Sequence, residues 1–149
     1  MSHLNKKERV LVAMSGGVDS SVCAALLAEQ GYEVIGLTLH LWDASGAAAV
    51  GRCCAPEDRE DARRSCEHLG IPHYVVDERL SFREQIVTPF KESYLAGKTP
   101  SPCVDCNQHL KLGRFVELAD AFDAAYIATG HYVRIEEDPE GLPRLFRGR

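Results

Sequence analysis

The stretch that decides the fold is Arg9-Val10-Leu11-Val12-Ala13-Met14, followed at once by Ser15-Gly16-Gly17-Val18-Asp19-Ser20-Ser21. A continuous apolar run predicts a strand in the middle of a parallel sheet, because such a strand is buried on both faces. We expect Ser15–Ser21 to be a turn and Val22–Gln30 to be a helix that ends at Gly31. A glycine-rich turn at a helix N-terminus is an anion site, since backbone N–H groups and the helix dipole meet there.

Downstream of this unit, short apolar runs alternate with helical patterns, as in βαβ units. Another helical pattern, Ser81–Ala96, contains Pro89, which is expected to kink or divide the helix. The other predicted segments before it are a strand over Glu33–Leu39, a loop over Asp43–Pro56, a helix over Glu57–Leu69 and a strand over His73–Asp77.

The last third of the chain begins with a proline-containing segment, Lys98–Cys106, which is expected to be an exposed loop. Asn107 is expected to cap a helix that runs to about Phe122. A fourth strand over Ala125–Thr129 completes the sheet pattern, and the tail Tyr132–Arg149 is expected to form two short strands joined across Asp138-Pro139-Glu140-Gly141. The sequence therefore predicts a doubly wound α/β fold, Rossmann-like, with at least four parallel strands.

Composition narrows the class of protein. The chain has 149 residues, 17 Lys and Arg against 22 Asp and Glu, a net charge of −5 and six cysteines. No apolar run approaches the roughly 20 residues that span a bilayer, and Met1–Arg9 has no secretory-signal pattern. Six cysteines in such a chain indicate a reducing compartment. We therefore expect one cytoplasmic domain with no membrane or DNA partner, whose contacts with nucleic acid are local.

The residues of the glycine-rich turn exclude two common kinds of phosphate-binding loop. The hydroxyls of Ser15, Ser20 and Ser21 add hydrogen-bond donors to the backbone amides. Neither Gly-x-x-x-x-Gly-Lys-Ser/Thr nor Gly-x-Gly-x-x-Gly is present. Without the lysine of the first motif, the loop is poorly suited to transfer of a terminal γ-phosphoryl group.

The segment Ser15-Gly16-Gly17-Val18-Asp19-Ser20 resembles the PP-loop of the ATP pyrophosphatases. The resemblance implies that this loop holds the β,γ-pyrophosphate of ATP while an acceptor oxygen attacks the α-phosphorus, which gives an adenylated acceptor. It also implies that Asp19 helps to bind Mg²⁺ beside the leaving pyrophosphate, where carboxylate and phosphate oxygens suit this cation.

Cys103 and Cys106 form a Cys-x-x-Cys pair just before a predicted helix. A cysteine at a helix N-terminus has a stabilised thiolate and is a better nucleophile at neutral pH. The same spacing fits a redox pair or half of a zinc or iron–sulfur site. A four-cysteine zinc site is disfavoured, because Cys53 and Cys54 are adjacent and not spaced.

Further segments identify a family. Thr99-Pro100-Ser101-Pro102-Cys103-Val104-Asp105-Cys106-Asn107 resembles the Thr-Pro-Asn-Pro-x-x-x-Cys-Asn signature of the tRNA-specific 2-thiouridylases, the MnmA/TrmU family. Ala125-Tyr126-Ile127-Ala128-Thr129-Gly130-His131-Tyr132 is similar to that family's Ala-Asp-Tyr-Ile-Ala-Thr-Gly-His-Tyr. The resemblance runs from Arg9 to about Arg149 and includes Leu69–Pro72 and the acidic segment after Cys54.

Members of this family use ATP to adenylate the C2 oxygen of wobble uridine 34 in tRNA, release pyrophosphate and replace the oxygen with sulfur. Two of the implied contacts, Leu39 and Gly130, follow strands, and ligands of open α/β sheets bind at the carboxyl ends of strands. The ATP-binding residues that the resemblance implies are Ala13, Met14, Ser15, Gly16, Gly17, Val18, Asp19, Ser20, Leu39 and Gly130.

The resemblance also assigns the cysteine segment. Cys106 matches the family nucleophile, and Ser101, Pro102 and Cys103 match the stretch that touches the target base. Ser101 replaces the usual Asn, and Cys103 stands where members have Asp or Cys. Because a thiol does not simply replace an acid/base carboxylate, Cys103 is a candidate partner of Cys106.

Lys111 and Arg114 lie one helical turn apart just after Cys106 and are candidate contacts for a tRNA phosphate. The family's second catalytic cysteine, which carries the persulfide, lies in a later segment that none of the six cysteines matches. We therefore interpret residues 1–149 as the ATP-binding catalytic domain of a longer enzyme, without its tRNA-binding and β-barrel domains. Its implied partners are tRNA and a sulfur-donor protein, and alone it is expected to bind ATP without completing thiolation.

Three alternatives remain from the sequence. Another PP-loop enzyme that adenylates a base or a small carbonyl has the same fold, although it needs no cysteine in the Thr99–Asn107 segment. A variant mechanism places a [4Fe-4S] cluster on Cys103, Cys106 and a downstream cysteine. The third alternative is a nucleotide-binding module without catalytic activity.

The expected roles of the other four cysteines and of one histidine do not depend on a motif. Cys23 and Cys66 are expected to be small core residues. Cys53 and Cys54 lie in the predicted loop, where a transient disulfide or a cluster is an alternative to a non-catalytic role. His131 follows Gly130 and is expected either to orient its loop or to act in catalysis.

Overall fold

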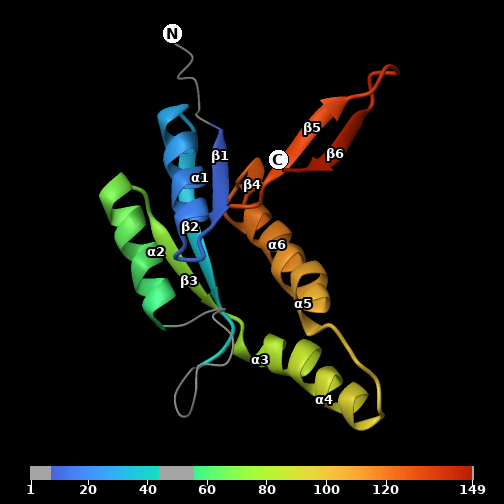
Figure 1. Ribbon diagram of the computed structural model, residues 1–149. Coiled ribbons are helices and arrows are strands. Elements are labelled where there is room, and N and C mark those ends of the chain that lie inside the picture. The colour runs from blue at the N-terminus through green and yellow to red at the C-terminus, as the bar shows by residue number, and fades with distance from the viewer. Residues whose placement is uncertain (1–7, 44–55, 149) are drawn as a thin grey trace.

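The computed structural model describes residues 8–43 and 56–148, and its centre is a parallel sheet with strand order β3-β2-β1-β4 (Figure 1). Each of the three strand pairings is parallel. The strands are β1 (Arg9–Ala13), β2 (Glu33–His40), β3 (His73–Asp77) and β4 (Tyr126–Ala128). The predicted doubly wound α/β sheet is confirmed, since helices pack against both of its faces.

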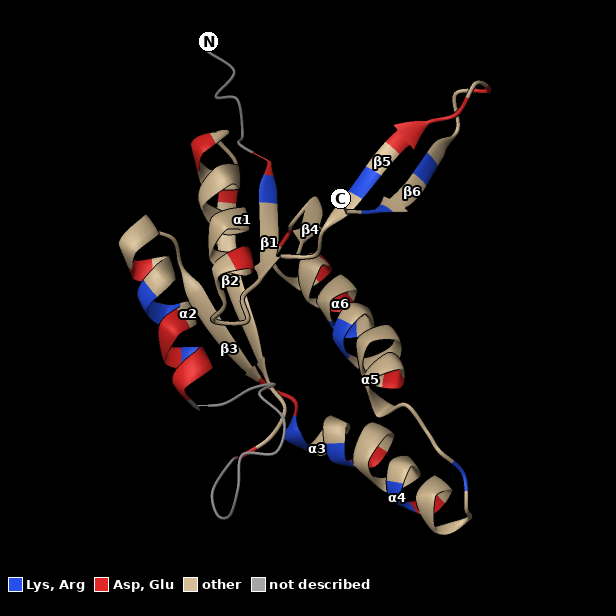
Figure 2. Ribbon diagram, viewed as in Figure 1, with Lys and Arg blue, Asp and Glu red and all other residues tan. Residues whose placement is uncertain are grey.

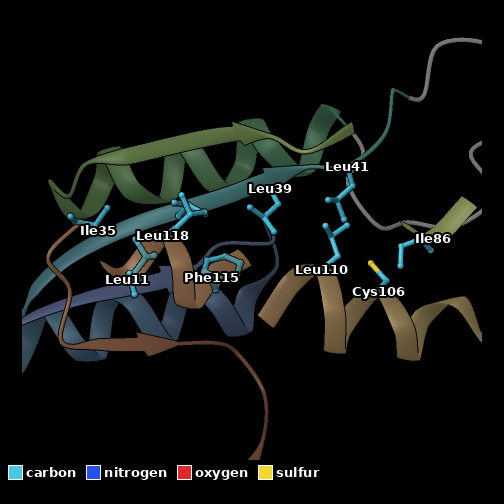
Figure 3. Close-up of a cluster of buried hydrophobic side chains, with 11 residues drawn as sticks. Leu11, Ile35, Leu39, Leu41, Ile86, Cys106, Leu110, Phe115 and Leu118 are labelled. Atoms are coloured by element: carbon cyan, nitrogen blue, oxygen red, sulfur yellow. The ribbon is translucent and has the colours of Figure 1, made fainter. Parts of the chain in front are cut away.

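The central strand β1 has a buried cluster on each side. Val10 and Val12 face α1 (Val18–Glu29) and α2 (Pro56–Leu69). Leu11 points the other way, toward α6 (Gly113–Ala121), whose Phe115 and Leu118 pack in the same cluster (Figure 3). Burial on both faces explains why the strand reads as an uninterrupted apolar run.

The strand order reverses at β1. The chain runs outward from β1 to β2 and β3, then returns across the opposite face to β4, which pairs with the free side of β1. Val12 therefore has Gly36 on one side and Ala128 on the other. Ligands of open α/β sheets bind beside such a reversal, at the carboxyl ends of the strands.

The first helix begins earlier than the sequence pattern predicts, at Val18 and not at Val22. Gly17 is extended and precedes the helix, and the hydroxyls of Ser20 and Ser21 both donate to its carbonyl oxygen, at 3.0 and 3.1 Å. Serines in the first turn thus form hydrogen bonds that are compatible with the helix and do not interrupt it. As a result, Asp19 lies within the first turn of α1 and not in a preceding loop.

The middle region is helical, as predicted, but Pro89 does not divide it, because helical elements follow one another without a gap from Arg79 to Leu95. The region comprises α3 (Arg79–Phe82), a π-helical segment η1 (Arg83–Val87) and α4 (Thr88–Leu95). Pro89 lies in the first turn of α4, directly after η1. The wider π-helical turn accommodates the missing N–H group and the ring that an uninterrupted α-helix would not.

The segment that carries the cysteine pair is helical earlier than predicted. It runs as α5 (Pro102–Asp105), a π-helical segment η2 (Cys106–Leu112) and then α6. Proline is well suited to the first position of a helix, because its φ is already helical and its missing N–H needs no partner there. The predictions of a loop through Cys106 and of a cap at Asn107 are therefore wrong, and Asn107 lies inside the helix.

The tail forms the predicted pair of short strands, β5 (Val133–Glu137) and β6 (Pro143–Arg147), which are antiparallel. Asp138 fixes their connection, since its Oδ1 accepts the N–H groups of Glu140 and Leu142 at 3.0 and 2.9 Å. Figure 1 shows this hairpin projecting away from the parallel sheet. Among the described residues, no helix is both long enough and apolar enough to cross a membrane.

Candidate functional site

A cavity of about 400 Å³ opens at the carboxyl ends of β1, β2 and β4. Of the predicted ATP-binding residues, Gly16, Gly17 and Val18 do not line it. Those that do are Ala13, Met14, Ser15, Asp19, Ser20, Leu39 and Gly130. The remaining lining residues are Leu37, Thr38, Leu41, Asp58, Arg59, Asn107, Lys111, Leu112, Phe115, Thr129 and His131.

The PP-loop, Ser15–Ser20, is held by its own hydroxyls. The N–H of Ser15 donates to Oγ of Ser20 at 3.2 Å, and the same oxygen donates to the carbonyl of Gly17. The first N–H groups of an α-helix have no intrahelical acceptor, so α1 presents the amides of Val18, Asp19 and Ser20 at this end. The loop thus offers an ordered set of donors that suits phosphate oxygens.

Two glycines let backbone segments approach this loop closely. Gly16 has φ +81°, and a β-carbon there would overlap the backbone carbonyl of Asp58 at the start of α2. A β-carbon at Gly130 would lie 2.8 Å from the backbone nitrogen of Ser20. The segment after β4 therefore passes directly over the N-terminus of α1, which brings two of the predicted nucleotide-binding segments together.

Asp19 has a hydrogen-bond partner that no sequence motif indicates. The hydroxyl of Tyr132 donates to Oδ1 of Asp19 at 2.7 Å. This hydrogen bond to a carboxylate raises the pKa of Tyr132, because deprotonation would place two negative oxygens in contact. The carboxylate that the resemblance assigns to Mg²⁺ is thus oriented from the segment after β4.

A polar chain beneath the cavity ties β3 to the end of β1. Oγ1 of the buried Thr38 donates to the carbonyl oxygen of Met14 at 2.8 Å and lies 2.9 Å from Nε2 of His73. Because the hydroxyl proton is used by Met14, Nε2 of His73 is the donor to Thr38. Burial, and then the charge of Arg63, lower the pKa of His73, which favours the neutral ring. A threonine in a buried strand was the one sequence signal for this network.

The cysteine pair is divided between surface and core. Cys103 is exposed, whereas Cys106 is 7% exposed and belongs to the same cluster as Ile86 and Leu110 (Figure 3). Cys106 does not line the cavity, but Asn107 of the same helix does. The thiol of the predicted nucleophile therefore lies in the apolar layer next to the cavity. Of the other predicted base contacts, Ser101 is exposed and Pro102 begins α5.

The two predicted tRNA-contacting cations occupy different environments. Lys111 lines the cavity. Arg114 is held in ion pairs with the buried Glu78 and, at 2.6 Å, with Glu117. Glu78 also accepts the hydroxyl proton of Ser81 at 2.8 Å. Arg114 therefore balances a buried carboxylate, and only Lys111 faces the site.

The other predicted residues are placed as follows. Cys66 is fully buried and Cys23 packs against the same cluster, which confirms their assignment to the core. Burial raises the pKa of the Cys66 thiol to about 11. His131 lines the cavity, with Nδ1 2.7 Å from Oγ1 of Thr129. Cys53 and Cys54 lie outside the described residues. Cys23, Cys66, Cys103 and Cys106 all carry thiols and form no disulfide.

Metal-binding side chains are sparse in the part of the chain that the structure describes: no group of three or more His, Cys, Asp or Glu is placed to hold a metal ion. Asp19 fits a Mg²⁺ ion that takes its remaining ligands from phosphate oxygens and water. Cys103 and Cys106 supply two thiols, whereas a [4Fe-4S] cluster takes four. The described residues thus fit a nucleotide-bound Mg²⁺ and do not form a complete cluster site.

Solved structures with a similar fold support the architecture. A predicted subunit of tRNA methyltransferase from Methanocaldococcus jannaschii matches with a TM-score of 0.56 and 24% identity, covering 84% of this chain and 53% of that one. The glutamine-dependent NAD+ synthetase of Acinetobacter baumannii, solved with ADP, matches with a TM-score of 0.57 and 16% identity, covering 85% and 22%. At these identities the similarity concerns the fold alone.

Curated relatives are much closer in sequence. The tRNA-specific 2-thiouridylase MnmA of Sorangium cellulosum is 58% identical over 142 residues, which is 95% of this chain and 37% of the relative. The MnmA proteins of Rhizobium etli and Magnetococcus marinus are 53% and 52% identical, with 95% and 97% of this chain covered and 36% and 41% of the relatives. This chain therefore spans little more than a third of their length.

The model of the family described as "tRNA methyl transferase HUP domain" matches residues 8–149. This match includes the PP-loop, the cysteine pair and the segment around Gly130, which are three of the segments that carry the sequence resemblance. The chain belongs to the tRNA methyl transferase HUP domain family, in which its curated relatives are MnmA-type tRNA-specific 2-thiouridylases.

Proposed function

We propose that this chain is the ATP-binding catalytic part of a tRNA 2-thiouridylase. In this reaction ATP adenylates the C2 oxygen of wobble uridine 34, pyrophosphate leaves, and sulfur displaces AMP. The names and the 52–58% identity of the curated relatives support this substrate class. A tRNA substrate is also the reason to propose a cytoplasmic location.

One observation carries the proposal: a single cavity is lined both by the PP-loop and by the helix that bears Cys106. Ser15, Asp19 and Ser20 line it from the PP-loop, and Asn107 and Lys111 line it from η2. A thiolating enzyme needs this arrangement, because the C2 oxygen attacks the α-phosphorus of ATP and sulfur then attacks the carbon that bears this oxygen, so that AMP leaves.

The residues around the cavity suit the parts of ATP. The N-terminus of α1 offers amides and a positive dipole end to the pyrophosphate. Leu39 and Gly130 lie at the ends of β2 and β4, where their backbone is available to the nucleoside. When bound, Mg²⁺ would neutralise the leaving pyrophosphate beside Asp19. Asp19 then serves to orient that end of the nucleotide.

Cys106 is proposed as the nucleophile, with Cys103 as its partner at the surface. At 7% exposure, Cys106 must be uncovered before a base can reach it. The π-helical segment Cys106–Leu112 is suited to such a shift, because π-helical hydrogen bonds are unusual and are frequent at functional sites. A persulfide-bearing cysteine and a sulfur-donor protein are proposed to come from outside this chain.

The proposal is tested with a chimera in which residues 8–149 replace the matching part of the Sorangium cellulosum relative. With wobble-uridine tRNA, ATP, Mg²⁺ and a persulfide-charged sulfur donor, the chimera is expected to release AMP and pyrophosphate, and Asp19→Ala is expected to reduce the rate at least about 100-fold. An exposed acidic residue of α2, changed in Glu67→Ala, is the matched control. AMP release that does not need tRNA would favour a different adenylating enzyme of this fold.

A further inference from the structure

Arg59 lies in the first turn of α2 and lines the same cavity as Ser15, Asp19 and Ser20. Neither the PP-loop motif nor the cysteine signature includes this residue. Its presence in the cavity depends on how α2 packs, because 38 or more residues separate it from the PP-loop. The position of α2 therefore needs to be established first.

Two contacts hold α2 against the PP-loop and the first turn of α1. The backbone of Asp58 packs on Gly16 so closely that only glycine fits there. About two turns further along, Oγ of Ser21 lies 3.1 Å from Oγ of Ser65. Arg59, which directly follows Asp58, is thus placed at the pyrophosphate end of the cavity by contacts that do not involve its own side chain.

The guanidinium of Arg59 differs from those of the next arginines on the helix. Charges alternate along α2 (Figure 2), and Arg63 and Arg64 both form ion pairs with Glu60. Nη1 of Arg59 is enclosed, yet it has no hydrogen-bond partner among the described residues. An enclosed N–H donor without an acceptor is unfavourable and rare in native proteins. Such a donor at the wall of a cavity indicates that the acceptor is a ligand.

The charges of the cavity indicate which ligand. The carboxylates of Asp19 and Asp58 would repel an anion, and Arg59 and Lys111 are the cationic lining residues that offset them. The loop itself has no Walker-type lysine. A guanidinium fork matches two phosphate oxygens and remains charged at any physiological pH.

We propose that Arg59 is a phosphate-binding residue of this cavity, whose guanidinium donates to the β,γ-pyrophosphate of the bound nucleotide. This rests on the proposed function, since it assumes that the cavity takes ATP. Arg59 supplies from α2 the positive charge that other phosphate loops place within the loop. It also holds the pyrophosphate as that group becomes the leaving group.

Calorimetric binding of ATP, AMP and inorganic pyrophosphate to the 149-residue chain, with Mg²⁺ present, tests this role. Arg59→Gln is expected to weaken ATP and pyrophosphate binding about 10- to 100-fold and AMP binding less than about 2-fold. Arg59→Lys keeps the charge without the fork and is expected to lose an intermediate amount. Arg64→Gln, on the same helix but outside the cavity, is expected to bind as the unaltered chain does.

Several outcomes would overturn the inference. Normal binding of ATP and pyrophosphate by Arg59→Gln would contradict the inference. An equal loss of affinity for AMP and ATP, together with a lower melting temperature, would indicate a structural role for Arg59. Normal ATP binding with weakened tRNA binding would assign Arg59 to RNA. If the unaltered chain binds neither ATP nor pyrophosphate, the proposed function fails as well. If it binds both and only Arg59→Gln is without effect, the function stands and this inference alone is wrong.

Discussion

The hydroxyl of Tyr132 donates a 2.7 Å hydrogen bond to Oδ1 of Asp19 across 113 residues of sequence. This bond connects the segment after β4 to the first turn of α1, where Asp19 lines the cavity. It sets the direction in which Oδ2 of Asp19 points. A side chain outside the PP-loop thus positions the carboxylate on which Mg²⁺ binding is proposed to depend.

Removing that hydroxyl is expected to weaken ATP binding without unfolding the chain. Tyr132→Phe leaves the exposed ring in place, so the melting temperature is expected to change little. The Mg²⁺-dependent affinity for ATP is expected to fall about 3- to 10-fold, or about 0.7–1.4 kcal/mol, which is within the range of a typical net hydrogen bond. Tyr94→Phe, at another exposed ring, is the control. Equal ATP affinity for Tyr132→Phe and Tyr94→Phe would show that the bond does not matter.

Gly16 is expected to be far more sensitive to substitution than other glycines with a similar backbone. Gly16→Ala combines a φ of +81° with overlap against Asp58, whereas Gly97→Ala has a φ of +76° and open space around it. Gly97→Ala is expected to cost about 1 kcal/mol of unfolding free energy, and Gly16→Ala about 2 kcal/mol more, because α2 must also move. Denaturant titration of both variants measures this difference, and similar losses would contradict the packing of α2 on the PP-loop.

The sequence predicted the elements whose signal is local. The buried run Val10–Val12 indicated the central strand, and the glycine-rich segment after it indicated the phosphate loop. Asp138 and its neighbours indicated the turn of the hairpin. In each case a few adjacent residues determine the outcome, through burial, backbone freedom or local hydrogen bonds.

The features that were missed depend on distant residues or on competing local signals. The sequence predicts Pro102 as a loop residue, although proline is equally suited to begin a helix; burial of Cys106 and Leu110 in the core favours the helix. The Tyr132–Asp19 bond and the entry of Arg59 into the cavity require the complete sheet order. Spacing along one chain does not contain that information.

The pH dependence of stability is expected to reflect His73. Its pKa is lowered in the folded chain, mainly by burial, so at falling pH the unfolded chain takes up a proton first. The contribution of neutral His73 to the unfolding free energy is therefore fully present above about pH 6.5, the ordinary histidine pKa. It is lost as the pH falls through the lower pKa of His73 in the folded chain.

His73→Gln is expected to flatten the pH dependence of the unfolding free energy between about pH 5 and 7. His68→Gln, at an exposed position of α2, is expected to leave the slope of the unaltered chain in place. Urea titrations at several pH values measure the slope. A His73→Gln variant as pH-dependent as His68→Gln would assign the effect to other groups.

Substitution of Arg114 is expected to reduce the stability of the chain, whereas substitution of Lys111 is expected to reduce its affinity for ATP. Arg114→Gln leaves the buried Glu78 without its cation, and because Arg114 is itself partly exposed the loss is expected to be about 1–3 kcal/mol. Lys111→Gln removes a cavity charge and is expected to weaken ATP binding with little change in melting temperature. If Arg114→Gln is as stable as the unaltered chain and defective only in tRNA binding, Arg114 contacts tRNA, and its proposed role in stabilising Glu78 is wrong.

The most direct test of the account is to measure pyrophosphate and 2-thiouridine in the same reaction, using the Sorangium cellulosum chimera with Cys106→Ser. We predict that tRNA-dependent pyrophosphate release persists through at least one turnover while 2-thiouridine in the tRNA falls below detection, and that Cys103→Ser loses less 2-thiouridine. Normal 2-thiouridine in the Cys106→Ser chimera, or a greater loss in Cys103→Ser, would contradict the assignment of Cys106 as the nucleophile beside the ATP cavity.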